Sequence, residues 1–88
     1  MASRMLQSQP DLALAQAGKV LRALPNHPDA ELIKGQALRR LGKPEAALLG
    51  LSALARRQPH MAAVIWELAQ AASEAGDTRQ AIAALETL

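Results

Sequence analysis

Residues that could carry out chemistry are few in this sequence, and their spacing does not gather them. The two histidines, His27 and His60, lie in separate proline-containing segments, the four serines are scattered, and the chain has no cysteine. A zinc site needs several Cys, His or carboxylate ligands, and a serine nucleophile needs a base within hydrogen-bonding reach. We therefore expect no catalytic residue, no metal site and no cofactor, and we interpret the chain as non-enzymatic.

Two arginine pairs, Arg39-Arg40 and Arg56-Arg57, raise the question of nucleic-acid binding. Both pairs are expected at the C-terminal ends of helices, where cations interact favourably with the helix dipole. The formal net charge is only +2, and Trp66 is the single aromatic residue, so bases would have almost no aromatic surface to stack on. We expect no nucleic acid among the partners.

The elements that position these residues follow from the helix breakers. Half of the residues are hydrophobic, mainly alanine and leucine, which are strong helix formers. Prolines suit helix starts and glycines suit helix ends, and together they divide the chain into five expected helices. These helices span residues 10–23, 29–41, 44–57, 61–75 and 77–88, approximately, and residues 1–7 are a candidate for a short leading helix. Asp77 to Gln80 has the form of a capping box, and the predicted fold class is all-α.

The sequence also repeats itself at a spacing of 34 residues. Equivalent pairs include Pro25 and Pro59, Gln36 and Gln70, Gly42 and Gly76, and Ala47 and Ala81. A fixed period of this size is typical of stacked helical arrays. Such arrays usually present a surface to a partner.

A unit of helix, glycine turn, helix and proline loop at this period resembles the tetratricopeptide repeat family. The small and bulky positions of the family are matched by Gly35, Leu38, Ala47, Leu51 and Pro59, and in the next unit by Ile65, Leu68, Ala69, Ala81 and Leu85. Glu31 and Lys34 depart from the pattern at positions that are usually large and apolar, which indicates looser packing there. The resemblance implies a single-domain α-solenoid of antiparallel helix pairs, a right-handed superhelix of about five helices. Residues 8–27 would be the second helix of a partial repeat, 28–61 a full repeat and 62–88 a truncated one.

The resemblance further implies where a partner would bind, because set positions of each first helix line the inner groove of the family. Those positions here are Leu32, Gln36, Arg39, Arg40, Trp66, Gln70, Ser73 and Glu74. We expect a peptide or protein segment to bind there, with Trp66 either anchoring it or packing within the array. The family's mode of clamping a C-terminal carboxylate uses Lys and Asn at positions that are Leu32 and Gln36 here, so we do not expect that mode.

Arrays of this kind close with a polar helix, whereas the last predicted helix carries Ile82, Leu85 and Leu88, which we call the C-terminal apolar edge. We interpret the chain as part of a longer array and predict that this edge promotes self-association.

An alternative interpretation is a helical N-terminal extension of a larger bacterial enzyme. The Ala/Leu/Arg-rich style resembles bacterial tetratricopeptide segments that precede sulfotransferase or aspartyl/asparaginyl hydroxylase domains. No apolar run approaches a secretory or membrane-spanning segment, so we expect a cytoplasmic protein without a membrane partner.

Overall fold

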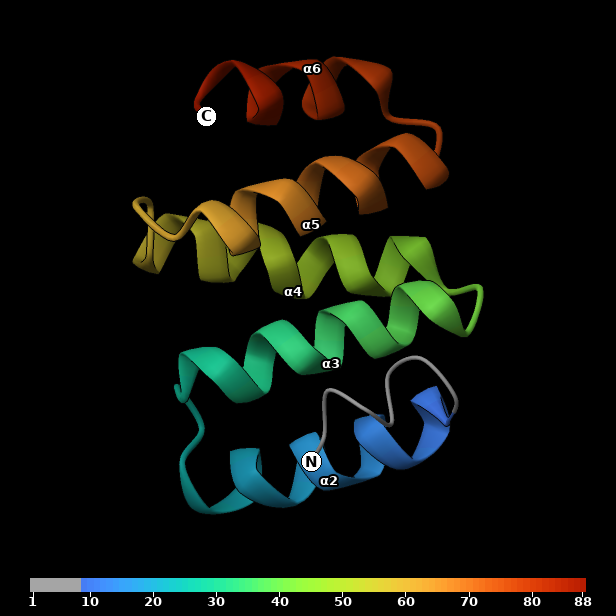
Figure 1. Ribbon diagram of the computed structural model, residues 1–88, viewed down its shortest axis with the longest axis vertical. Helices are drawn as coiled ribbons and strands as arrows, with labels where there is room; N and C mark the ends of the chain where they lie inside the picture. The colour runs from blue at the N-terminus through green and yellow to red at the C-terminus, as the bar shows by residue number, and fades with distance from the viewer. Residues whose placement is uncertain (1–8) are drawn as a thin grey trace.

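The computed structural model describes residues 9–88, and across that range it is all-helical with no strand. The helices are α2 (Pro10–Ala23), α3 (Pro28–Arg40), α4 (Pro44–Arg57), α5 (Ala62–Glu74) and α6 (Thr78–Glu86) (Figure 1). These elements confirm the predicted all-α fold, while the leading helix suggested for residues 1–7 lies outside the described residues. The last helix stops at Glu86 instead of reaching residue 88. Beyond it, the amide and the hydroxyl of Thr87 both donate to the Ala84 carbonyl, at 3.1 and 2.7 Å.

Two glycines 34 residues apart end the first helix of each complete pair in the same way. Gly42 and Gly76 have φ values of 78° and 85°, a backbone conformation that side chains disfavour. The amide of the next residue reaches back to a carbonyl of the last helical turn, from Lys43 to Leu38 at 2.9 Å and from Asp77 to Ala72 at 2.8 Å. This is the Schellman arrangement, which satisfies helix carbonyls that would otherwise lack a partner. The sharp reversals let each pair of helices run antiparallel.

The helix starts combine proline with two side-chain caps. Pro10, Pro28 and Pro44 each stand at the beginning of a helix, where the missing N–H leaves no bond unmade. The carboxylate of Asp77 accepts a hydrogen bond from the Gln80 amide at 3.0 Å, as the predicted capping box requires.

The second half of that capping box does not form. The Gln80 side chain instead donates to the Ser52 hydroxyl on α4 at 3.1 Å. His27, which the sequence placed in a loop, caps α3 by accepting from the Ala30 amide at 3.2 Å. The bond between Gln80 and Ser52 depends on the tertiary arrangement of α4 and α6, whereas the His27 cap is local to the start of α3.

The helices form an α-solenoid-like stack in which each packs on the next, with α2 at one end and α6 at the other (Figure 1). The described chain measures 32 × 24 × 18 Å along its principal axes. Besides the consecutive contacts, α3 touches α5 directly. Since α4 contacts both of these helices, α3 and α5 lie side by side with α4 behind them, and they present a shared outer surface.

The main core is built from small and branched side chains of α4, α5 and α6. Its buried members are Ala47, Leu51, Ile65, Leu68, Ala69, Ala71 and Ala84, with Leu32 and Leu38 of α3 packed against them. Gly35 allows α3 to approach this core closely, because a Cβ at residue 35 would lie only 2.6 Å from Leu51 Cδ2 and 2.7 Å from its Cγ. The small residue expected at position 35 is therefore a steric requirement of the α3–α4 contact.

Candidate interaction surface

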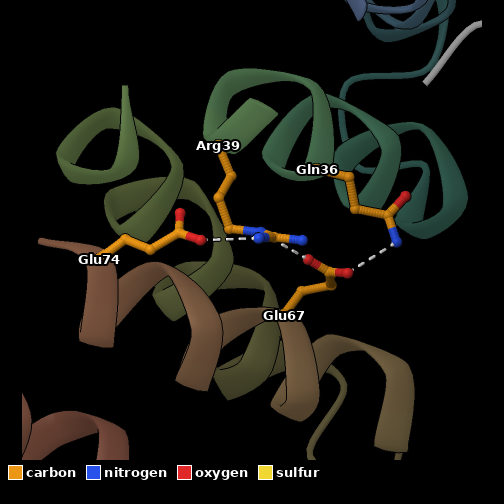
Figure 2. A network of polar contacts seen from close by, with 4 residues as sticks. All are labelled: Gln36, Arg39, Glu67 and Glu74. Atoms are coloured by element: carbon orange, nitrogen blue, oxygen red, sulfur yellow. Dashed lines mark hydrogen bonds and ion pairs between the residues drawn. The ribbon is translucent and has the colours of Figure 1, made fainter. Parts of the chain in front are cut away.

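The surface shared by α3 and α5 carries a polar network that joins the two helices. Gln36 Nε2 and Arg39 Nε on α3 donate to the two carboxylate oxygens of Glu67 on α5, at 3.2 and 3.1 Å. Arg39 Nη1 also donates to Glu74 at 2.9 Å, about two turns further along α5 than Glu67. Figure 2 shows the guanidinium of Arg39 between the two carboxylates, with Gln36 on the far side of Glu67. The network thus ties the first helix of one repeat to the first helix of the next.

Glu67 is the most enclosed charge in this network, with 7% of the residue exposed. A carboxylate removed from water is costly unless it is paired and hydrogen-bonded. Glu67 meets both conditions, since one oxygen receives the amide of Gln36 and the other the guanidinium of Arg39. Its side chain is therefore held in a single arrangement.

Arg39 remains charged within this arrangement. Burial by itself would lower the pKa of the guanidinium, but the hydrogen bond and charge of Glu74, together with the charge and hydrogen bond of Glu67, outweigh that effect and raise the pKa. Two acidic partners and one cation leave the cluster with a formal charge of −1. The arrangement can position side chains and attract hydrogen-bond donors.

The exposed stripe of α5 lies beside the network. Trp66, Gln70 and Ser73 follow each other at intervals of four and three residues, so they share one side of the helix, and Gln70 is one turn from Glu74. Trp66 is 51% exposed. Half of the indole surface therefore remains open to solvent in the described residues, and the side chain is not enclosed within its own repeat.

The residues nominated from the sequence fall into three groups. Gln36, Arg39 and Glu74 meet in the network, and Trp66, Gln70 and Ser73 form the neighbouring stripe. Leu32 is half-buried against the main core, and Arg40 is exposed and makes no ion pair with any of residues 9–88. We call the network and the stripe together the α3–α5 face.

Glu67 is the member that the sequence reasoning missed. It lies outside the family positions that line the groove, and its partners are 31 and 28 residues away along the chain. One signal was available. Glu67 is the only charged residue between Val64 and Ala72, a run whose other buried members are apolar. A lone charge in such a run is rarely enclosed without a partner, so it indicates a pairing residue on a neighbouring helix.

Two further observations limit the kinds of site that residues 9–88 can form. No group of three or more His, Asp or Glu side chains within this range is arranged to hold a metal ion. Among the described helices, none combines the length and the apolar character required to cross a bilayer.

Comparisons with protein-family models, with curated proteins and with solved structures found no match to this chain.

Proposed function

We propose that this protein is a non-catalytic interaction module that binds a peptide or protein segment along the α3–α5 face. The observation that carries the proposal is the half-exposed Trp66 beside an ordered polar network. Tryptophan and arginine are enriched among the residues that dominate binding energy at protein interfaces. A large aromatic side chain left at the surface, next to side chains already held in place, suits a site that is largely formed before its partner arrives.

The network would aid binding mainly by holding its side chains in place before the partner binds, and less by direct contacts with the partner. Gln36, Arg39 and Glu67 already bond to one another, so a partner would not need to immobilise them. The side-chain amides of Gln36 and Gln70 can still form hydrogen bonds with the backbone of a partner segment that lies across the two helices. Trp66 would supply the apolar contact, because its open half is the largest aromatic surface available in the chain.

Selection of peptides from a random library displayed on phage would test this proposal. Binding of each selected peptide would be measured by the fluorescence of Trp66, which is the only tryptophan and reports on the face itself. We expect Trp66→Ala to weaken binding about 30-fold, the effect of losing an interface residue worth ~2 kcal/mol; the binding of this variant would be followed by a label on the peptide. Leu12→Ala on α2 removes an apolar side chain that is 45% exposed at the end of the stack, and it should leave affinity unchanged.

Two results would contradict the proposal. One is a library that yields no peptide binding better than background. The other is a set of peptides whose affinity is indifferent to both Trp66→Ala and Gln70→Ala.

A further inference from the structure

A second surface, away from the α3–α5 face, carries two clefts whose lining residues are related by the 34-residue spacing of the repeat. One has a volume of about 390 Å³ and is lined by α2, α3 and α4. The other has a volume of about 660 Å³ and is lined by α4, α5, α6 and Thr87 just beyond α6. Pro25, Glu31 and Lys34 line the first, and the residues 34 positions later, Pro59, Ile65 and Leu68, line the second. We call them the α2–α4 cleft and the α4–α6 cleft. They are the same hollow in successive repeats.

Among their equivalent residues, the two clefts differ in charge at two positions. Where the α4–α6 cleft has Ile65 and Leu68, the α2–α4 cleft has Glu31 and Lys34. Glu31 forms an ion pair with Arg57, which compensates its charge. Lys34 is exposed and forms no ion pair within residues 9–88. The α2–α4 cleft therefore carries an ion-paired carboxylate and an uncompensated cation at the two positions where the α4–α6 cleft has apolar side chains.

Leu49 stands between the clefts and lines both of them. It is 78% exposed, the highest value among the large hydrophobic residues in the described part of the chain. Arg56 lines the α4–α6 cleft and is also exposed without an ion pair to residues 9–88. The surface thus combines an exposed leucine with cations on both sides. Its charged residues are one anion, Glu31, and three cations, Lys34, Arg56 and Arg57.

This second surface is distinct from the site of the proposed function. Lys34 and Gln36 are two residues apart on α3, and residues at that spacing do not share a helix face. Neither cleft is lined by Trp66, Gln70 or Glu74. A ligand can therefore occupy the clefts without touching the α3–α5 face.

We propose that the two clefts and Leu49 form a docking surface for an acidic amphipathic segment of a partner protein. An apolar side chain of that segment packs on Ile65 and Leu68 in the α4–α6 cleft, its neighbour covers Leu49, and a carboxylate meets Lys34 in the α2–α4 cleft. Charge complementarity selects this occupant. A neutral or basic segment would cover Lys34 and Arg56 without pairing them, and covering an unpaired charge is unfavourable.

A pair of synthetic helical peptides provides the test. Both carry leucines along one face and a fluorescein label, and the remaining positions are glutamate in one peptide and glutamine in the other. Fluorescence anisotropy with the whole chain should show binding of the glutamate peptide and much weaker binding of the glutamine peptide. Leu49→Ala should weaken binding about tenfold, since it removes most of a newly covered leucine side chain. Lys34→Gln and Arg56→Gln should each weaken it about two- to fivefold.

Matched variants separate this site from general attraction of charge. Arg40→Gln removes an exposed cation from the same helix as Lys34, and Leu12→Ala removes an exposed leucine from α2. Neither should change the affinity, and the thermal transitions of all these variants should match that of the parent because each side chain is exposed. Trp66→Ala should also leave the affinity unchanged.

Three results would overturn the proposal. The first is no anisotropy change with the glutamate peptide, and the second is equal weakening by Arg40→Gln and Lys34→Gln, which would mean unspecific electrostatic binding. The third is weakening by Trp66→Ala with no effect of Leu49→Ala, which would place the peptide on the α3–α5 face.

Discussion

Replacing Gly35 by alanine tests the steric account of the α3–α4 contact, because the chain offers two matched controls. Gly18, Gly35 and Gly50 all lie inside helices. A Cβ at residue 35 would meet Leu51 at 2.6–2.7 Å, whereas a Cβ at residue 18 or 50 would meet nothing within 4 Å. The same chemical change is therefore crowded at one position and free at the other two.

The expected change in the free energy of unfolding is stabilising for the two controls and neutral to destabilising for Gly35→Ala. Alanine is favoured over glycine in a helix interior by about 1 kcal/mol, so Gly18→Ala and Gly50→Ala should each stabilise the fold by roughly that amount. At residue 35 the same gain is opposed by overpacking of about 1–3 kcal/mol. Leu51 is 0% exposed and belongs to the main core, so a shift of its side chain would disturb the packing of that core. We expect Gly35→Ala to fall about 1–3 kcal/mol below the two controls in stability.

Thermal unfolding followed by circular dichroism would measure this difference. For a domain of this size 1 kcal/mol corresponds to a Tm shift of about 4–8 °C, so the gap between Gly35→Ala and Gly18→Ala should be clear. In a Leu51→Ala background the clash disappears, and Gly35→Ala should then become neutral or stabilising. Equal Tm values for the three alanine variants would refute the reasoning, as would an unchanged effect of Gly35→Ala in the Leu51→Ala background.

Three other changes have expected outcomes that equilibrium or hydrodynamic measurements can check. Glu67→Ala should lower the free energy of unfolding in urea by about 1–3 kcal/mol, because it leaves Gln36 and one donor of Arg39 without their enclosed partner. The Glu74 side chain is 43% exposed, so Glu74→Ala should lower it by less than about 1 kcal/mol. Similar losses for the two variants would contradict the burial argument. Asp77→Ala should cost about 1 kcal/mol by removing the α6 cap, and an unchanged urea midpoint would mean that the cap does not contribute. The C-terminal apolar edge, whose three side chains are 45–58% exposed, should raise the mass measured by light scattering as concentration increases, and a constant monomer mass for the parent would count against self-association through it.

The features that could be predicted from the sequence are those that depend on a few neighbouring residues. The turns at Gly42 and Gly76 follow from glycine in a left-handed conformation, and the cap at Asp77 reaches only three residues ahead. Helix starts at proline are similarly local. The small residue at 35 was also predicted, because the repeat pattern carries information about the contact between paired helices.

The features that could not be predicted join residues far apart in the chain. Glu67 has partners on another helix, and no spacing within α5 identifies them. Gln80 was assigned to its own capping box, yet in the fold the Ser52 hydroxyl on α4 is close enough to accept its side chain instead. The equivalence of the two clefts needs the three-dimensional stack as well, although the substitution of Glu31 and Lys34 for apolar residues was visible beforehand.

The Arg39 network crosses the contact between α3 and α5, two helices that are not consecutive in the chain. In a one-dimensional description of a repeat array, each unit has its own stability and a coupling to the next. Here part of that coupling is ionic, whereas the interiors of the units are apolar. Added salt screens the partly exposed Arg39–Glu74 pair but leaves apolar burial intact or strengthens it. Ionic strength therefore changes the cooperativity of folding between neighbouring units, separately from the stability of each unit.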